Sequence, residues 1–344
     1  MAPLPHRNGI IGFNTTAALA FGLHGLLRFL PPEIWFWLQW LDLLTPGLVA
    51  SLWLWLLWRH KKGRGILVLN GVLMALLFAG FNSNLGFQPE STNADLRILT
   101  FNAGGFSNSE ADLSAANEAI RNLNPDVVVF QEFGFLPWWK KADTLVGVVA
   151  SQLNLPYSSL YRHRFNVFGL AIFSRYPILQ ADTLFLPVNV GNAAIKPTLQ
   201  HPDKTIDLLH LHLASFNYGH RLDTVKGTWN RIQSFPQITR ETYREQKQQL
   251  KQIFETAEES TSPLMLAGDF NNVPGSWIYR QLDLKYQEAF QEAGSGLGYT
   301  HTSWLVPLRI DHVWSDENWE PVFARTVALP GSDHKALLAD FRWR

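Results

Sequence analysis

The sequence predicts a mixed α/β or α+β domain that is preceded by three transmembrane helices. Two observations support this expectation. Three long apolar segments fill most of residues 1–90, and from residue 96 onward short apolar runs typical of strands alternate with stretches of helical spacing. We expect a membrane anchor over residues 1–90, a linker over 91–95 and one folded domain over 96–344.

The apolar segments cover about residues 10–30, 34–58 and 65–87. Each is long enough to cross the hydrocarbon core, which needs about 20 mostly apolar residues. The second segment contains one acidic residue and has tryptophan near both ends, where indole rings favour the headgroup region. A cleaved signal peptide is an alternative for the first segment only, and three buried core helices are the alternative for all three.

Basic residues predict the topology of the anchor. The turn between the second and third segments contains Arg59, Lys61, Lys62 and Arg64, whereas the turn between the first two contains Arg28. Because basic turns stay in the cytoplasm, three crossings place the domain that follows in the periplasm or outside the cell.

Composition excludes several classes of site. Residues 91–344 carry 23 Lys and Arg against 26 Asp and Glu, so the domain is slightly acidic, which argues against a general polyanion binder. The chain has no cysteine, which excludes disulfides, thiolate metal sites and a cysteine nucleophile.

The elements of the domain follow one another in a mixed order. Residues 96–105 read as a strand that enters a polar loop, residues 110–124 have helical spacing, and Pro125 ends that helix before the next strand. Later strands are expected in 168–178, 205–215, 263–270, 309–314 and 332–343, with a polar helix from about Thr242 to Ala257.

Polar side chains recur at the ends of these strands. Each one alone has a structural explanation, as a turn residue, a solvated acid or a buried histidine. Metal-binding or acid/base side chains at so many strand ends predict a shared site. They are Asn102, Glu132, His212, Asp269, Asn271, Asp311, Asp333 and His334.

The motifs "TFNAGG", "QEF", "HLHL", "GDFNNVPGS", "RIDHVW" and "SDHKAL", in this order, resemble the endonuclease/exonuclease/phosphatase superfamily. That group includes DNase I-like nucleases, sphingomyelinases and inositol polyphosphate phosphatases. The resemblance covers about residues 95–344 and implies a four-layer sandwich of two packed mixed β-sheets flanked by helices. The architecture is also similar to membrane-anchored bacterial members, which implies a multi-pass protein of the bacterial inner membrane.

Phosphoester hydrolysis requires a group that neutralises the phosphoryl oxygens. The Glu132 carboxylate suits Mg²⁺, or Mn²⁺, and Asn102 would complete or orient that site. The resemblance implies that Asp333 is an acid near the metal.

The same chemistry requires an aligned water and donors to the phosphate. Asp269 would accept a proton from the attacking water or align it, and Asn271 would donate its amide to a phosphate oxygen. His334 would hydrogen-bond the phosphoryl group, with Asp311 as the acid that orients its ring. His212 matches the superfamily's phosphate-contacting histidine.

Two further segments have two interpretations each. Arg175 lies where family members often place an arginine near the phosphate, and a structural salt bridge is the alternative. Trp138 and Trp139, followed by Lys140 and Lys141, have the composition of a membrane-interface contact, and a helix start with the tryptophans packed inward is the alternative.

These expectations combine into one functional hypothesis. The protein is expected to be an extracytoplasmic, divalent-metal-dependent phosphoesterase that acts on a phosphorylated membrane lipid, such as a polyprenyl pyrophosphate, a phospholipid or a sphingolipid. The alternatives are a membrane-tethered nuclease, which the acidic domain disfavours, and a non-catalytic binding domain.

The topology predicts the accessibility of residue 91. The variant Ser91→Cys introduces the only thiol of the chain, and we expect an impermeant thiol reagent to label it on intact cells. The control variant Lys62→Cys is expected to react only after the membrane is permeabilised. Protection of residue 91 together with labelling of residue 62 would reverse the topology.

Overall fold

The computed structural model describes residues 86–87, 94–134, 142–162, 168–184, 192–217, 221, 227–302 and 307–344. The predicted spans at 10–30 and 34–58 and the segment 138–141 lie outside these residues. So does the third predicted span except for its last two residues, which form the short strand β1 (Gly86–Phe87), so the predicted boundary at residue 87 is corrected. Of the helices that the structure describes, none combines the length and the apolar character that a membrane crossing requires.

The chain divides into two compact units, Met1–Ala75 with Asn217–Arg244, and Leu76–Phe216 with Glu245–Arg344. In the first unit, Arg221 forms an ion pair with Glu241, with 2.8 Å between guanidinium nitrogen and carboxylate oxygen. The second unit contains both large sheets and all the predicted site residues.

Each large sheet has six strands and mixes parallel with antiparallel pairs. The first sheet has the order β15 (Trp319–Ala328), β16 (Lys335–Trp343), β2 (Leu96–Asn102), β3 (Val127–Phe133), β5 (Gly169–Ser174), β4 (Tyr157–Arg162). The second has the order β10 (Gln287–Glu288), β14 (Asp311–Ser315), β9 (Leu264–Asp269), β8 (Thr205–His212), β7 (Ala194–Gln200), β6 (Ile178–Leu184). Two-stranded ladders join β1 to β11 (Ser295–Gly296) and β12 (His301–Thr302) to β13 (Pro307–Leu308).

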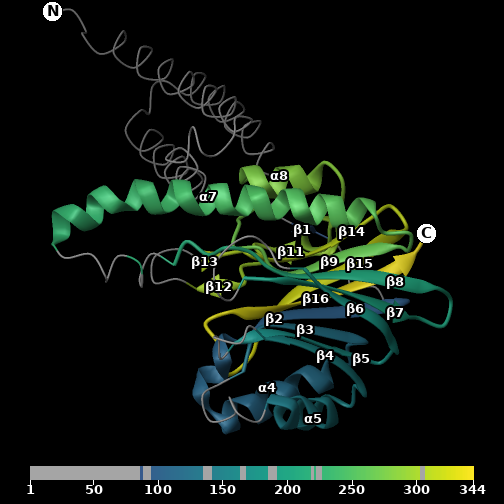
Figure 1. Cartoon of the computed structure of the whole chain (residues 1–344). Coiled ribbons are helices and arrows are strands. Elements are labelled where there is room, and N and C mark those ends of the chain that lie inside the picture. Colours follow the sequence, from purple (N-terminus) through teal and green to yellow (C-terminus); the bar gives the residue numbers. More distant parts are fainter. Residues whose placement is uncertain are drawn as a thin grey trace, which may run out of the picture. The chain divides into compact units, whose positions relative to one another are not determined.

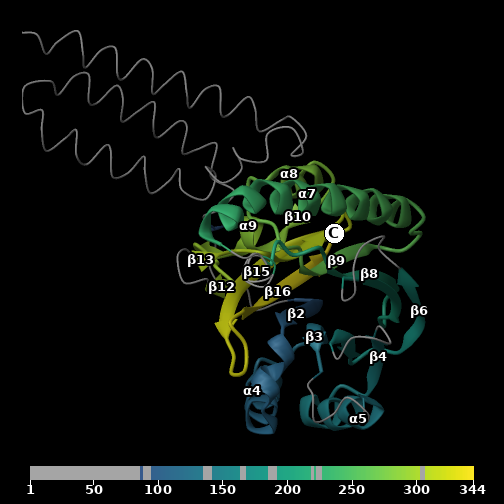
Figure 2. The ribbon, with the colours of Figure 1, turned by 60° about the vertical axis from the view of Figure 1, so that its left-hand side comes forward.

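The two sheets pack face to face, and helices cover their outer faces (Figures 1 and 2). One apolar core lies between the sheets and includes Ile98, Val129, Ile172, Leu208 and Met265. This arrangement is consistent with the predicted four-layer sandwich, because the alternating strand residues of both sheets face the shared core or the helices.

Helices α4 (Glu110–Asn122) and α5 (Ala142–Leu153) pack on the outer face of the first sheet. The N-terminus of α4 is capped by Ser109, whose hydroxyl accepts a hydrogen bond of 3.2 Å from the backbone N–H of Asp112. A short 3-10 segment, η2 (Gly104–Asn108), connects β2 to this helix.

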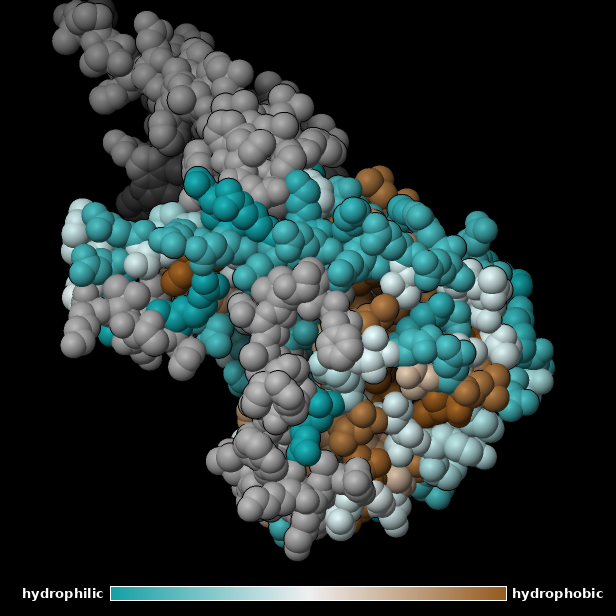
Figure 3. Space-filling view, viewed as in Figure 1, coloured by the Kyte–Doolittle hydropathy of each residue, from teal (hydrophilic) through white to brown (hydrophobic). Residues whose placement is uncertain are grey.

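Helix α8 (Trp277–Asp283) and the C-terminal part of α7 (Thr228–Glu258) pack on the outer face of the second sheet. Leu250 and Ile253 of α7 are buried there, while Lys251 and Glu255 form an exposed ion pair of 3.5 Å. Figure 3 shows hydrophilic side chains along the outer surface of α7. The short helix α9 (Ala289–Ala293) follows β10.

The strand β9 ends with Gly268 and Asp269, and Gly268 has a φ of +150°. A Cβ atom at this position would collide with the backbone carbonyl of Leu211 on the neighbouring parallel strand β8. The position therefore needs glycine both for its backbone conformation and for the close approach of the two strands.

We predict that Gly268→Ala lowers the stability of the folded domain by about 3 kcal/mol or more, because it combines backbone strain with overpacking. The matched control is Gly147→Ala in α5, where a Cβ would meet open space and where alanine should stabilise the helix by about 0.5–1 kcal/mol. Thermal unfolding of the full chain in detergent measures both variants. Equal midpoints for Gly268→Ala and the wild type would contradict the prediction.

Candidate active site

Three predicted site residues lie in one row across the second sheet. His212 of β8 is the in-register partner of Asp269 on β9, and Asp269 is the partner of Asp311 on β14. All three side chains are buried. Because β8 and β9 are parallel and β14 is antiparallel, the carboxyl ends of two strands meet the start of the third at one edge of the sheet.

The Asp311 carboxylate binds the His334 ring, which lies one residue before β16 in the other sheet. His334 Nδ1 donates to Asp311 Oδ2 over 2.9 Å, and Asp311 is fully buried. This bond fixes the ring tautomer, and it directs Nε2 away from Asp311. The predicted pairing of Asp311 with His334 is therefore present in the structure.

The Asp269 carboxylate is held by three groups. Asn102 Nδ2 donates to Oδ2 over 3.0 Å, the backbone N–H of Asn271 donates to Oδ1 over 2.8 Å, and His212 Nε2 lies 3.7 Å from Oδ2. The Asn271 side-chain amide donates to the Leu213 carbonyl over 3.0 Å, and its second hydrogen can donate to a substrate oxygen.

Glu132 joins this cluster through Asn102, whose amide also donates to Glu132 Oε1 over 3.3 Å. The pairing of β3 with β5 shifts register between Phe130 and Phe133, and Glu132 adopts a φ of +49°. A bulge of this kind redirects a side chain relative to the regular strand. The strained backbone of Glu132 therefore occurs at the residue whose side chain contacts Asn102 in the site.

The electrostatics of the cluster favour a proton on His334. Burial lowers the pKa of the His334 imidazole, but the carboxylates of Asp311, Asp269 and Asp333 together outweigh burial and raise this pKa to about 10. Burial and the neighbouring Asp311 carboxylate raise the pKa of Asp269, against the opposing effects of His334, His212 and the Asn102 hydrogen bond. Asp269 is therefore a stronger base than an ordinary carboxylate.

Two hydroxyl side chains tie the segments of the site together. Ser332 Oγ donates to the Asn102 carbonyl over 2.7 Å and accepts from the His334 N–H over 3.0 Å. Thr300 Oγ1 accepts from the backbone N–H of Asp311 over 3.1 Å, and the Thr300 carbonyl accepts from Lys335. The sequence analysis did not identify Thr300, because a threonine in a polar loop carries no signal of its long-range partners.

A buried polar layer supports the site from behind. His312, next to Asp311 on β14, points to the opposite side, where its ring contacts Glu288 Oε1 at 3.2 Å and the Asn272 carbonyl at 2.9 Å. The Asn272 amide also donates to the Phe270 carbonyl over 2.9 Å. These bonds fix the turn that follows Asp269.

A second buried polar contact lies between the two sheets, where Gln131 Nε2 of β3 and Nε2 of the fully buried His210 of β8 are 2.8 Å apart.

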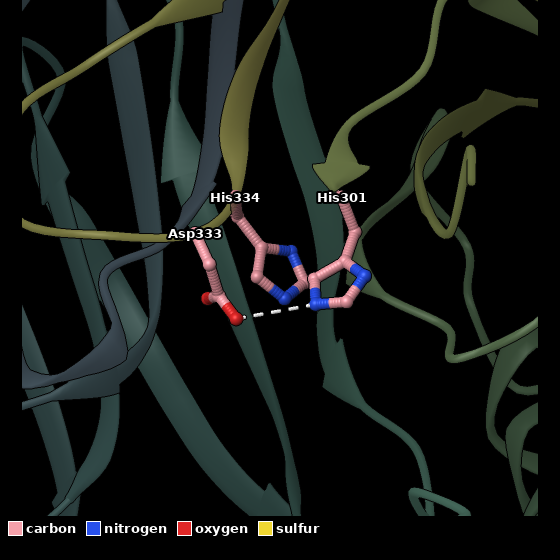
Figure 4. A group of neighbouring side chains, drawn as sticks. All are labelled: His301, Asp333 and His334. Carbon is pink, nitrogen blue, oxygen red and sulfur yellow. Dashed lines mark hydrogen bonds and ion pairs between the residues drawn. The ribbon is translucent and has the colours of Figure 1, made fainter. Parts of the chain in front are cut away.

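Asp333 lies at the rim of the site and faces a histidine that the sequence analysis did not identify. His301 Nε2 donates to Asp333 Oδ2 over 3.2 Å, and the rings of His301 and His334 are 4.7 Å apart (Figure 4). His301 belongs to the two-residue strand β12, which is too short to show a periodic pattern.

The structure corrects the assignment of Arg175 to the substrate phosphate. Strand β5 is antiparallel to β3, so Arg175 follows the end of β5 beside the start of β3, at the opposite end of β3 from Glu132. There Arg175 forms an ion pair of 3.1 Å with Asp126 and donates to Asn124 over 2.9 Å. The alternative interpretation, a structural salt bridge, describes this position.

Two groups in the described part of the chain have the donor sets to hold a cation. They are Asp269 with Asp311 and His334, and His301 with Asp333 and His334; within each, the ligand atoms lie within 4.8 Å of one another. The predicted ligands Glu132 and Asn102 form a third arrangement, in which the partly exposed carboxylate supplies the oxygen atoms that Mg²⁺ prefers.

Comparison with known proteins identifies related sequences and folds. Residues 99–334 match the family described as the Endonuclease/Exonuclease/phosphatase family. A segment is 29% identical over 147 residues to an inositol phosphosphingolipids phospholipase C of Schizosaccharomyces pombe, and this match covers 38% of this chain and 33% of that relative.

Solved structures share the fold at low identity. An endonuclease/exonuclease/phosphatase from Beutenbergia cavernae is 18% identical and has a TM-score of 0.53, over 73% of this chain and 72% of that one. The human Nocturnin catalytic domain with a bound sulfate anion is 17% identical with a TM-score of 0.50, over 72% and 93% of the two chains. At these identities the likeness establishes the fold alone.

The Asp311–His334 pair generates a prediction about proton affinity. In Asp311→Asn, we expect the pKa of His334 to fall from about 10 to its ordinary value or below, because burial then penalises the charged ring with less compensation. NMR titration of histidine-labelled protein measures this pKa, with His334→Asn for assignment and the remaining histidine signals as an internal control. An unchanged titration midpoint would show that Asp311 does not hold the proton on His334.

Proposed function

The chain belongs to the Endonuclease/Exonuclease/phosphatase family, whose members hydrolyse phosphoester bonds, and we propose that it is a membrane-anchored, metal-dependent phosphoesterase acting on a lipid head group outside the cytoplasm. The observation that carries the hydrolytic part is the convergence of Asp269, His212 and the Asp311–His334 pair with Asn102 and Glu132. This set contains a base, a charged donor and an oxygen ligand, which are the parts that phosphoester hydrolysis requires.

Glu132 is the residue that would hold Mg²⁺ or Mn²⁺ in this proposal, and Asn102 would orient its carboxylate. Members of the family are typically dependent on a divalent metal, and a hard cation beside one carboxylate with several waters suits Mg²⁺. The cation would neutralise charge on the phosphoryl oxygens when bound. The side-chain oxygen Oδ1 of Asn102 accepts a hydrogen bond of 3.1 Å from the Gly104 N–H. This bond holds the side-chain NH2 group facing Glu132 and Asp269.

The protein residues would act on the water and on the phosphate. Asp269 takes a proton from the attacking water, and its raised pKa suits that role. The imidazolium of His334 donates from Nε2 to a phosphoryl oxygen as charge develops there. Asn271 and His212 flank Asp269 and donate to the same phosphate group.

A lipid substrate is supported by two independent observations. The relative from Schizosaccharomyces pombe is a phospholipase C of inositol phosphosphingolipids, and the three apolar segments of residues 1–90 have the length of membrane spans. The match covers about one third of that relative. It therefore supports a lipid phosphoester as the substrate but does not specify the head group. The slight acidity of residues 91–344 argues against a polynucleotide substrate.

We predict that detergent-purified full-length protein hydrolyses a phosphorylated lipid in the presence of Mg²⁺. The panel contains undecaprenyl pyrophosphate, sphingomyelin, phosphatidylinositol phosphates and plasmid DNA. A chelator should abolish activity, and Asp269→Asn should lower kcat about 10²–10⁴-fold because it removes the base.

The matched control is Asp182→Asn, which changes an exposed aspartate of β6 that binds Gln180 and should leave kcat unchanged. Hydrolysis of DNA alone would overturn the lipid substrate in favour of a nuclease. Activity that survives both the chelator and Asp269→Asn would overturn the mechanism.

A further inference from the structure

Three side chains at the rim of the site direct their metal-binding atoms to one point. His301 comes from β12, and Asp333 and His334 come from the turn before β16 (Figure 4). One ligand atom from each lies within 4.8 Å of the other two, and His301 Nε2 is 3.2 Å from Asp333 Oδ2. Tetrahedral ligands at about 2.0–2.2 Å from a zinc ion lie roughly 3.3 Å from one another, so this His301–Asp333 separation already fits.

The donor types select a transition metal over Mg²⁺. Two imidazole nitrogens and one carboxylate form a borderline set that suits Zn²⁺, whereas Mg²⁺ takes oxygen ligands and retains its waters. Three protein ligands leave the remaining position for water, as in zinc sites that stay open to solvent. Asp333 is 68% exposed and His301 is 21% exposed, so an ion can reach the site from solvent.

The site is held in place by contacts that do not involve its ligand atoms. His301 and His334 form a backbone bridge, and the Thr302 N–H donates to the Asp333 carbonyl over 3.3 Å. His334 Nδ1 is bound to the Asp311 carboxylate over 2.9 Å, which leaves Nε2 as the free ring nitrogen. A carboxylate behind the histidine, with the metal in front, is the arrangement that orients histidine ligands in metal sites.

We propose that His301, Asp333 and His334 bind a zinc ion, and that zinc bound there inhibits the enzyme. Binding uses the Nε2 lone pairs of His301 and His334. His301 binds as the tautomer that carries its proton on Nδ1, so the ion replaces the hydrogen bond from His301 to Asp333. The proton on His334 Nε2 leaves to solvent. The same nitrogen is the one that donates to the phosphoryl group in the proposed mechanism, so the imidazole cannot serve zinc and substrate together. The inhibitory half of this inference rests on the proposed function, and the binding half does not.

Metal binding is tested without an activity assay. Co²⁺, a spectroscopic substitute for Zn²⁺, is titrated into full-length protein in detergent with excess Mg²⁺ present. We expect a visible absorption band from the tetrahedral ion, displaced by one equivalent of Zn²⁺, and at least about tenfold weaker binding in His301→Ala and in Asp333→Asn.

The matched control is Asp203→Asn. Asp203 is 65% exposed and its carboxylate lies 3.5 Å from the His201 ring, so it is an exposed aspartate beside a histidine, as Asp333 is beside His301. It lies in the turn between β7 and β8, at the opposite end of the second sheet from His212 and Asp269. The control should bind Co²⁺ as the wild type does. Equal Co²⁺ binding by His301→Ala, Asp333→Asn and the wild type, or the absence of the band in the wild type, would overturn the zinc site.

Inhibition is measured as the Zn²⁺ concentration that halves lipid hydrolysis in Mg²⁺, normalised to the activity of each variant without Zn²⁺. We expect this concentration to rise at least about tenfold in His301→Ala and to stay unchanged in Asp203→Asn. Equal zinc sensitivity of His301→Ala and the wild type would overturn inhibition through this site. If no substrate is hydrolysed, the proposed function fails while the Co²⁺ titration still decides the metal site.

Discussion

The candidate site depends on the balance of charge around two buried carboxylates. Asp269 and Asp311 are in-register partners on adjacent strands and are almost completely excluded from solvent. Burying one uncompensated charge costs several kcal/mol, and two like charges side by side add repulsion. The fold meets this constraint with the charged ring of His334 on Asp311 and with amide donors from Asn102 and Asn271 on Asp269.

The same constraint explains why both sheets are needed. Asp269, Asp311 and His212 belong to one sheet. In the other sheet, Asn102 ends β2, Glu132 is the last residue but one of β3, and His334 lies directly before β16. Asn102 and His334 therefore reach the carboxylates only when the two sheets pack face to face, whereas Asn271 and His212 reach Asp269 from its own sheet. Packing of the apolar core therefore also completes the site, and Ser332 adds a direct link by bonding both the Asn102 backbone carbonyl and the His334 N–H.

Much of this arrangement could be predicted from sequence because strand ends carry local signals. The apolar run before Asp269 and the short run before Asp311 predict strands, and polar residues after parallel strands meet at one edge. No local sequence signal shows whether β5 runs parallel or antiparallel to β3. Because it is antiparallel, Arg175 at its end lies at the opposite end of β3 from the site. Helix α7 begins at Thr228, well before the predicted start near Thr242, and it continues through Pro236, a residue that normally ends helices.

Long-range pairing accounts for the residues that the sequence did not identify. His301 contacts Asp333, which lies 32 residues further along the chain, and neither β12 nor its partner β13 is long enough to show alternation.

With His301 included, the donors of the site separate into two groups. Glu132 and Asp269 offer carboxylate oxygen atoms and are linked by the Asn102 amide, whereas His301 and His334 offer nitrogen beside Asp333. Hard and borderline cations prefer different groups, so the metal that supports hydrolysis and the metal that we propose as inhibitor need not compete for the same ligands. Zinc would instead compete with the substrate phosphate for His334, the one residue that the proposed chemistry and the proposed zinc site share.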